Sequence, residues 1–427
     1  MNLKVIKIGT LPTLLLLMLL LASLAPAQVS ERDRIKIFEK VWDTVNRKYY
    51  DPNFNGVNWS ATRESYRPQI VAAKDDTEFY ALVKQMVGEL GDAHTSFRTP
   101  LEAQRAKLKQ TVGVGLWLGE VEGKSVIFGV TPDSEAAKAG LVPGMILTAV
   151  DGRDVREILS EMRSKIKSST ANAVNRLAYA RLLGGEVDSS VKLDLLDLEG
   201  REKQVTLARR VQTSTNSELI SRRLPSNIGY VRFDEFLSKH LKPYKNALIE
   251  LKDTKGLIID LRFNRGGSTL ALEEMAERLI AEKVSFGRAK TRTGKMPKFL
   301  GISLIPKEMF VGDDDMHIYS APVVVLISRY SASAAEYFAV GMQESGRAKT
   351  VGETSCGCLL GITGKTKIEG GELYLSRIDF ISAQGKRIEG VGVTPDVAIA
   401  PSIGDVKAGF TLAIAEAEKM LTGLPNL

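Results

Sequence analysis

Residues 331–336 read Ser-Ala-Ser-Ala-Ala-Glu and follow the apolar run Val-Val-Val-Leu-Ile of residues 323–327. The run predicts a buried strand, and the stretch from Glu336 to Gln343 predicts a helix directly after it. A small hydroxyl at this junction would lie near unpaired backbone N–H groups and the positive end of the helix dipole, which favours a nucleophilic serine. The alternative is a Ser/Ala-rich N-cap without chemistry. Other parts of the sequence are needed to decide between a nucleophile and a plain helix cap.

Composition indicates a globular protein. The chain has 427 residues, of which 44% are hydrophobic and 26% charged, which predicts about two to three domains. The formal net charge is +7, from 58 basic and 51 acidic residues, and the basic residues are scattered. This weak electrostatic bias argues against a nucleic-acid partner.

The N-terminus, residues 1–27, is predicted to be an export signal. Two lysines precede the apolar residues 11–24, and Ala25-Pro26-Ala27 offers small residues at a cleavage site. An uncleaved anchor is the alternative, but the apolar stretch is shorter than the roughly 18 to 20 residues of a spanning helix. We expect an exported protein, periplasmic or extracellular, with no stable membrane span after signal cleavage.

Both cysteines, Cys356 and Cys358, lie in one short stretch. Two cysteines in an exported chain would ordinarily suggest a disulfide. Because a single residue separates them, we expect a bridge between them to strain the usual geometry. Two thiols alone also make a poor zinc site.

Residues 28–105 are predicted to form a helical N-terminal domain. Apolar residues recur at helical spacing from Ile35 to Tyr49 and again from Phe79 to Leu90, with turn signals in between. The second helix should end near Gly91. This would place His94 in a loop, where functional residues are common.

Residues 106–211 carry strand and turn signals. Residues 113–118 read Gly-Val-Gly-Leu-Trp-Leu, and residues 134–150 predict a short helix and a strand. These stretches resemble a PDZ domain, whose carboxylate-binding loop would be Gly113, Val114, Gly115 and Leu116. In that mode, backbone N–H groups bind a terminal carboxylate while the peptide extends a sheet. A glycine-rich turn in an ordinary barrel is the alternative.

Residues 212–427 alternate strands and helices, which predicts a largely parallel, buried sheet. Four motifs occur here in order: Asp-Leu-Arg-Phe-Asn-Arg-Gly-Gly at 260–267, the serine stretch at 331–336, Gly-Arg-Ala at 346–348 with Val-Gly-Glu at 351–353, and Glu-Gly-Val-Gly-Val-Thr-Pro-Asp at 389–396. Together they resemble the C-terminal processing, or tail-specific, serine protease family, which includes the tricorn core protease. The resemblance covers nearly the whole mature chain.

This resemblance implies an α/β fold with a helical N-terminal segment, a PDZ-like β-rich domain and a catalytic domain related to crotonase and Clp protease. It makes Ser333 the nucleophile. It also implies an oxyanion hole formed by the N–H of Ala334 and a backbone N–H of Gly266 or Gly267.

One position departs from many members of the family. Cys358 stands where they have a catalytic lysine, and Lys365 would need an insertion-like shift to replace it. A serine hydroxyl needs a base. The tricorn branch uses a histidine supported by a glutamate, and His94 and Glu389 match those positions. Tricorn has a serine before its histidine where this chain has alanine, and Thr95 is a possible substitute.

Other roles for these residues stay open. His94 could hydrogen-bond the end of its helix, and Glu389 could fix its own loop through backbone N–H groups. Cys358 as nucleophile is a further alternative. His240 and His317 are predicted to be surface residues.

The sequence therefore predicts an exported serine endopeptidase with PDZ recognition of C-termini or extended segments, acting through an acyl-enzyme. Its partners would be protein or peptide substrates with free C-termini, together with an adaptor or a second copy of the chain. No metal or organic cofactor is expected. The alternative is a catalytically inactive peptide- or ligand-binding protein on the same fold.

Overall fold

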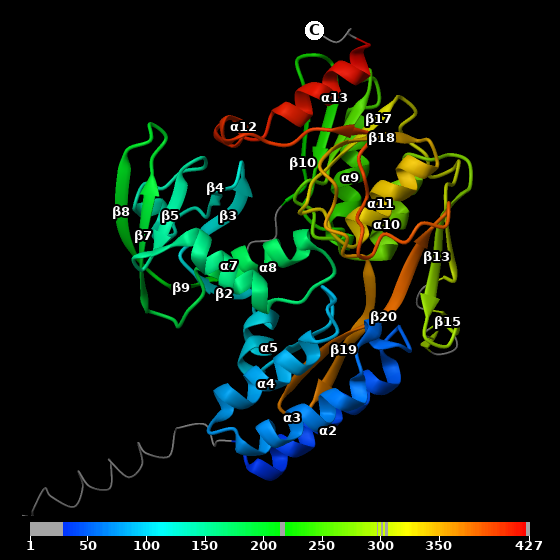
Figure 1. The fold of residues 1–427 in the computed structure, drawn as a ribbon. Coiled ribbons are helices and arrows are strands. Elements are labelled where there is room, and N and C mark those ends of the chain that lie inside the picture. Colours follow the sequence, from blue (N-terminus) through cyan, green and yellow to red (C-terminus); the bar gives the residue numbers. More distant parts are fainter. Residues whose placement is uncertain (1–28, 214–217, 297, 300–301, 304–305, 424–427) are drawn as a thin grey trace, which may run out of the picture.

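The structure, a computed structural model, describes residues 29–213, 218–296, 298–299, 302–303 and 306–423. The predicted export signal at residues 1–27 lies outside them. Figure 1 shows N-terminal helices at one end, a β-rich body to one side and an α/β body at the other end. Within the described residues, we find no helix with the length and apolarity needed to cross a membrane.

The N-terminal region is mainly helical, as predicted. Ser30 caps the first helix through its side chain, which accepts the Asp33 N–H, and Asp75 caps α4 in the same way. The helix α3 was not predicted, although it contains Trp59, a core residue. The elements are α2 (Glu31–Lys48), η1 (Phe54–Gly56), α3 (Trp59–Ala72), α4 (Asp76–Gly88), β1 (Ser96–Arg98) and α5 (Pro100–Lys107).

A long hairpin joins these helices to the α/β body, and Figure 1 shows it running between the two. Its apolar residues Leu360, Leu373 and Leu375 belong to the helical core. Strand β1 pairs with β20 in antiparallel register, Ser96 opposite Tyr374, so the chain just after His94 is fixed to the hairpin. The sheet order is β1-β20-β13-β16, with β19 on β20. Besides β1, the strands of this sheet are β13 (Val284–Thr291), β16 (Glu308–Val311), β19 (Leu360–Ile368) and β20 (Gly371–Ser382). A separate two-stranded ribbon is formed by β14 (Lys298–Phe299) and β15 (Ile302–Ser303).

The β-rich body has its own core around a sheet of order β3-β4-β5-β7-β8, with β6 on β5 and a separate β2-β9 pair. The elements are β2 (Gln110–Gly113), β3 (Leu116–Val121), β4 (Lys124–Val130), α6 (Glu135–Lys138), β5 (Ile146–Val150), β6 (Arg153–Asp154), α7 (Val155–Lys165), α8 (Ala171–Leu182), β7 (Ser190–Leu196), β8 (Glu202–Ala208) and β9 (Arg210–Thr213).

The α/β body is built on the sheet β10-β11-β12-β17-β18-β21. All neighbouring pairs from β11 to β21 are parallel, which confirms the prediction of a largely parallel sheet. The elements are β10 (Ile220–Arg223), β11 (Gly229–Arg232), α9 (Ser238–Glu250), β12 (Leu257–Asp260), α10 (Thr269–Glu277), β17 (Val323–Ile327), α11 (Ala334–Glu344), β18 (Ala348–Gly352), β21 (Val397–Ala398), α12 (Ile403–Lys407) and α13 (Leu412–Thr422).

Helices cover both faces of this sheet. In β17, Val323, Val325 and Ile327 pack with α9, α10 and α11, whereas Val324 and Leu326 pack with α13. This two-sided burial explains the unbroken apolar run, because a strand covered on one face would alternate apolar and polar residues. The carboxyl ends of β12 and β17 lie side by side. The two loops that follow these strands carry the predicted nucleophile and glycine pair.

Candidate active site

Ser333 lies in the tight connection between β17 and α11. It is the N-cap residue of α11, but its φ of 59° and ψ of −123° differ from the extended conformation of an ordinary N-cap such as Ser30. A positive φ in a residue with a side chain costs roughly 1 to 3 kcal/mol and is often found at functional sites. The conformation therefore favours a nucleophile over a plain helix cap.

The neighbouring Ser331 has a structural role. It is fully buried, its hydroxyl donates to the Leu261 carbonyl at 2.8 Å, and its Oγ accepts the Ser328 N–H at 2.9 Å. These bonds fasten the β17–α11 turn to the end of β12. Of the two serines in the motif, Ser333 is the one that stays partly exposed.

The glycine loop after β12 lies against Ser333. A Cβ on Gly266 would stand 2.6 Å from the Ser333 Cβ and 3.0 Å from the Ala334 nitrogen. At the Gly266 φ of 97° a side chain would also be strained. Any larger residue at position 266 would collide with the serine, so glycine allows the two loops to meet.

Two backbone N–H groups near Ser333 have no hydrogen-bond acceptor among the described residues. Ala334 is the first residue of α11, where the N–H has no intrahelical partner. The Gly266 N–H donates to Asn264 Oδ1 at 2.8 Å. The Gly267 N–H has no such bond, although both its chain neighbours bond Phe236. Gly267, and not Gly266, thus keeps an available donor.

Glu336 holds the loop 355–358 beside the nucleophile. Its fully buried carboxylate accepts the N–H groups of Ser333, Gly357 and Cys358 at 3.0, 2.6 and 2.9 Å and the Ser355 hydroxyl at 2.6 Å. Burial raises the pKa of Glu336, and these hydrogen bonds oppose the rise. The motif contained this residue, but its role depends on a loop that the sequence does not place.

Cys356 and Cys358 form a disulfide in the structure, the pairing that two cysteines in an exported chain ordinarily suggest. The loop can form this bridge because hydrogen bonds at both cysteines fold its backbone back on itself. The Cys358 carbonyl accepts the Ser333 N–H at 2.9 Å, and the Cys356 N–H donates to the Ser331 carbonyl at 2.9 Å. Lys365 lies further along on β19 and forms an ion pair with Glu372 at 2.6 Å.

His94 lies in the loop between α4 and β1. Asp92 shapes this loop by accepting the N–H groups of His94 and Thr95 at 2.8 and 2.7 Å, and Ala93 packs on the buried group that contains Ala332 and the two cysteines. The His94 loop and the Ser333 loop are therefore in contact. The imidazole itself forms no hydrogen bond to Ser333 or Glu389, and its buried Nδ1 has no partner among the described residues.

Burial lowers the pKa of His94 to about 4, and the positive charge of Arg176 adds to this effect while Asp92 opposes it. The imidazole is therefore neutral at pH 7, as a general base requires. The other two histidines lie elsewhere. His240 is buried in α9, with its Nδ1 2.9 Å from the Glu235 carbonyl oxygen, so the prediction of a surface position is wrong. His317 is half-buried, and its Nε2 lies 3.0 Å from the Tyr319 carbonyl oxygen.

Glu389 is buried, with 4% of its surface exposed. Its carboxylate accepts the Leu359 N–H at 2.6 Å. Burial raises its pKa to about 7, assisted by the negative charges of Asp92 and Glu336, while Ser169 and Leu359 hold it down by hydrogen bonding. Thr95 does not point to this group, because its hydroxyl is paired with Ser376.

The predicted peptide-binding loop joins β2 to β3 in the β-rich body. Its carbonyl groups are engaged, since Val114 accepts the Ala136 N–H at 3.0 Å and Gly115 accepts the Thr131 N–H at 2.8 Å. The loop thus packs on the start of α6. Gly113 and Leu116 are the flanking strand residues.

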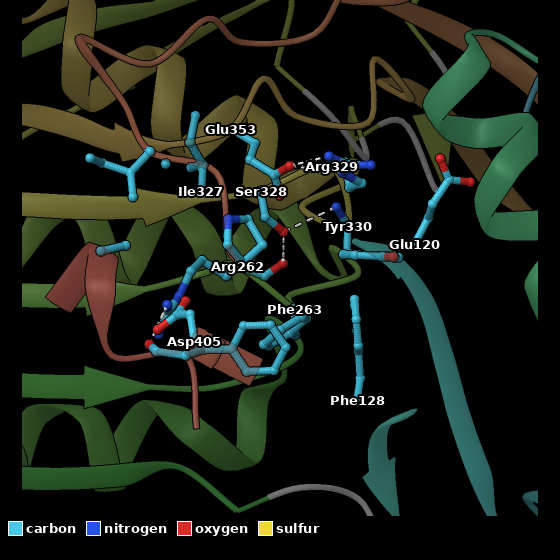
Figure 2. Close-up of a pocket in the computed structure, with 15 residues that line it drawn as sticks. Glu120, Phe128, Arg262, Phe263, Ile327, Ser328, Arg329, Tyr330, Glu353 and Asp405 are labelled. Atoms are coloured by element: carbon cyan, nitrogen blue, oxygen red, sulfur yellow. Dashed lines mark hydrogen bonds and ion pairs between the residues drawn. The ribbon is translucent and has the colours of Figure 1, made fainter. Parts of the chain in front are cut away.

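Trp117, directly after this loop, connects the β-rich body to the glycine loop. Its ring meets Phe263 edge-on at 4.6 Å between centroids. Figure 2 shows the neighbouring cavity, which Glu120 and Phe128 line from one body and Phe263 and Tyr330 from the other. No predicted catalytic side chain lines this cavity. It is part of the contact between two bodies and not the reaction centre.

Comparison with known proteins places the chain among peptidases. Residues 227–399 match the model of peptidase family S41, and residues 30–88 match the tricorn protease C1 domain. The chain is 26% identical over 405 residues to the chloroplastic C-terminal processing peptidase of Tetradesmus obliquus, covering 90% of this chain and 80% of that protein. It is 24% identical over 420 residues to the carboxyl-terminal-processing protease of Synechocystis sp., covering 93% of this chain and 89% of that protein.

Among solved structures, mature CPAF complexed with lactacystin superimposes with a TM-score of 0.73 at 14% identity, covering 92% of this chain and 99% of that one. This similarity concerns the fold, a mixed α/β architecture with several sheets. The family model and the sequence relatives add the chemistry. They identify the chain as an enzyme, a serine-type peptidase.

Proposed function

We propose that this serine-type peptidase cleaves protein or peptide substrates through an acyl-enzyme on Ser333. One observation carries the assignment: a serine with a φ of 59° stands beside two backbone N–H groups, Ala334 at the start of α11 and Gly267 in the glycine loop, that have no acceptor among the described residues. Such donors stabilise the oxyanion that forms when a hydroxyl attacks a peptide carbonyl. The non-catalytic alternative has no comparable support, since the relatives are named processing peptidases.

In the proposed reaction, Ser333 Oγ attacks the scissile carbonyl and its proton passes to His94. The imidazolium then donates that proton to the leaving amine as the peptide bond breaks. Water, deprotonated by His94, hydrolyses the ester and restores the serine. Glu389 stabilises the charged imidazole. Because His94 forms no bond to Ser333 or Glu389 in the structure, substrate binding has to bring the three together.

Labelling with a serine-directed fluorophosphonate tests this assignment. Wild type should form a covalent adduct, and Ser333→Ala should form none. His94→Ala should react much more slowly, because the hydroxyl would have lost its base. An adduct that persists in Ser333→Ala would assign the nucleophile elsewhere.

We further propose that residues 106–211 act as a PDZ module that binds C-termini or extended segments. The support is the loop from Gly113 to Leu116, which leads into β3 at the edge of its sheet. In PDZ-type recognition the bound peptide adds a strand at such an edge. Amidating the C-terminus of a bound peptide should weaken its affinity by about 1 to 3 kcal/mol, the scale of lost hydrogen bonds to a charged group. Equal affinity for the acid and the amide in a binding titration would assign internal segments as the ligand.

Export follows as a proposal from the N-terminal sequence, which has the charge and length pattern of a cleaved signal. The protein would then act in a periplasmic or extracellular space. The disulfide of Cys356 and Cys358 supports this location, because such bonds persist in oxidising compartments. N-terminal sequencing of the mature protein should begin near Gln28.

A further inference from the structure

The segment that joins α7 to α8 belongs in sequence to the β-rich body, yet it lies among the active-site loops. The Thr170 hydroxyl donates to the Cys356 carbonyl, and Asn172 Nδ2 donates to the Ser355 carbonyl at 3.2 Å. Ala173 packs with Ala332 and the two cysteines. The β-rich body is thereby fastened directly to the loop beside the nucleophile.

Ser169 is the residue of this segment that lies next to both the loop of His94 and the loop of Glu389. Its Oγ accepts the N–H of Ala93, the residue before His94, at 3.0 Å. Its hydroxyl is also near enough to the Glu389 carboxylate to lower the pKa of that group. Its backbone is equally close, since a Cβ on Gly390 would stand 3.9 Å from the Ser169 carbonyl oxygen.

A hydroxyl suits this place because it has both a donor and acceptor sites. It can accept a backbone N–H while donating to a carboxylate, which a carboxylate or an amide nitrogen alone could not do. The immediate neighbours of His94 do not supply such a group. Ala93 has no hydroxyl, and the Thr95 hydroxyl is paired with Ser376.

We infer that Ser169 is a positioning residue, which holds the His94 loop beside the loop of Glu389 and so makes the β-rich body a component of the catalytic machinery. This inference rests on the proposed function. It goes beyond it by adding a residue that touches neither substrate nor nucleophile and that comes from a different part of the chain.

The test compares Ser169→Ala with Ser168→Ala. Ser168 is a matched control, because its neighbouring Oγ is also buried but has no hydrogen-bond partner among the described residues. In Ser169→Ala we expect kcat on a short peptide to fall about 10- to 100-fold, because a His94 loop released from Ser169 would misplace the proposed base, with KM little changed. Ser169→Thr keeps the hydroxyl and should recover most of the lost activity.

The pH profile separates positioning from a general loss of packing. The Ser169 hydroxyl lowers the pKa of Glu389, so its removal should raise that pKa. If ionised Glu389 is needed for turnover, the acid limb of kcat/KM moves to higher pH in Ser169→Ala and stays in place in Ser168→Ala. A kcat and an acid limb that match those of wild type, or equal losses in both variants, would overturn the inference.

Amide hydrogen exchange gives a readout that does not depend on activity. The Ala93 amide should be protected in wild type and should exchange faster in Ser169→Ala, while Ser168→Ala matches wild type. Rapid exchange of this amide in wild type itself would refute the contact even if a variant failed to fold. If fluorophosphonate labelling shows no reactive serine in wild type, the proposed function fails, and the exchange result still decides whether Ser169 holds the His94 loop.

Discussion

The chemistry of His94 depends on its buried surroundings. Burial and Arg176 keep the imidazole neutral at pH 7, and its Nδ1 stays unpaired among the described residues. Replacing His94 by alanine should lower kcat by about 10²- to 10⁴-fold, the usual contribution of a general base. His317→Ala is the control, because that histidine follows β16 and pairs with its own loop. Steady-state kinetics on one peptide measure both, and comparable activity in the two variants would reject the base assignment.

Glu389 makes stability depend on pH. Its pKa is raised to about 7 in the folded protein, so ionising it costs folding free energy. This cost is absent below the unfolded pKa of about 4.3 and fully present above pH 7. Relative to wild type, Glu389→Gln should therefore gain up to about 3 kcal/mol in unfolding free energy between pH 4.5 and pH 8. Urea denaturation at several pH values measures the difference. A constant difference across this range would mean that Glu389 ionises normally.

At the scale of elements, Glu336 and not the disulfide organises the loop 355–358. The carboxylate accepts four hydrogen bonds, and Glu336→Ala would remove this acceptor. The Ser333 N–H keeps the Cys358 carbonyl as acceptor, but the other three donors have none, so we expect a loss of about 3 kcal/mol or more in stability and of most activity.

Cys358→Ala is the comparison for that loop. It removes the bridge but keeps the backbone carbonyl that accepts the Ser333 N–H, so most activity should remain. Thermal unfolding and peptide turnover of the two variants provide the comparison. A greater loss in Cys358→Ala would give the disulfide the leading role.

Several elements could be predicted from the sequence because their patterns are local. The run 323–327 and the turn at Ser333 are contiguous, and so are the capped helices around residues 35–49 and 79–90. The helix α3 was missed because its apolar face is narrow, with only Trp59 and Ile70 fully buried. His240 looked exposed among polar neighbours, yet Phe233, which lies outside its helix, packs edge-on against its ring.

The candidate site shows the same limit. Ser333 and the glycine pair follow from motifs, whereas Ser169 could not be found, because it lies 76 positions from Ala93 along the chain. No local pattern marks a residue whose partners come from two distant loops. The choice of Gly267 over Gly266 likewise depends on a hydrogen bond from Asn264 that only the folded loop reveals.

At the scale of the whole molecule, the β-rich body contacts the catalytic centre in two places. One contact is the Ser169 segment on the His94 and Glu389 loops. The other is the ring contact between Trp117 and Phe263. Trp117 directly follows the proposed peptide-binding loop, and Phe263 lies three positions before Gly266. A shift of this body would therefore disturb both the proposed base and the proposed oxyanion donors. The β-rich body could gate the enzyme, meaning that its movement would change the activity of the site. Deleting residues 111–210 would not test this, because the deletion would also remove Ser169.

Trp117→Ala tests gating while leaving Ser169 in place. If the body gates the enzyme, losing the Trp117–Phe263 contact should change kcat on a short peptide that does not engage residues 113–116, because catalysis is sensitive to displacements of about 1 Å. If the body only tethers substrates, this kcat should stay within about twofold of wild type while turnover of long substrates falls. Val211→Ala, an exposed position on β9 of the same body, controls for nonspecific effects. An unchanged short-peptide kcat in a folded Trp117→Ala variant would exclude gating through the Trp117–Phe263 contact.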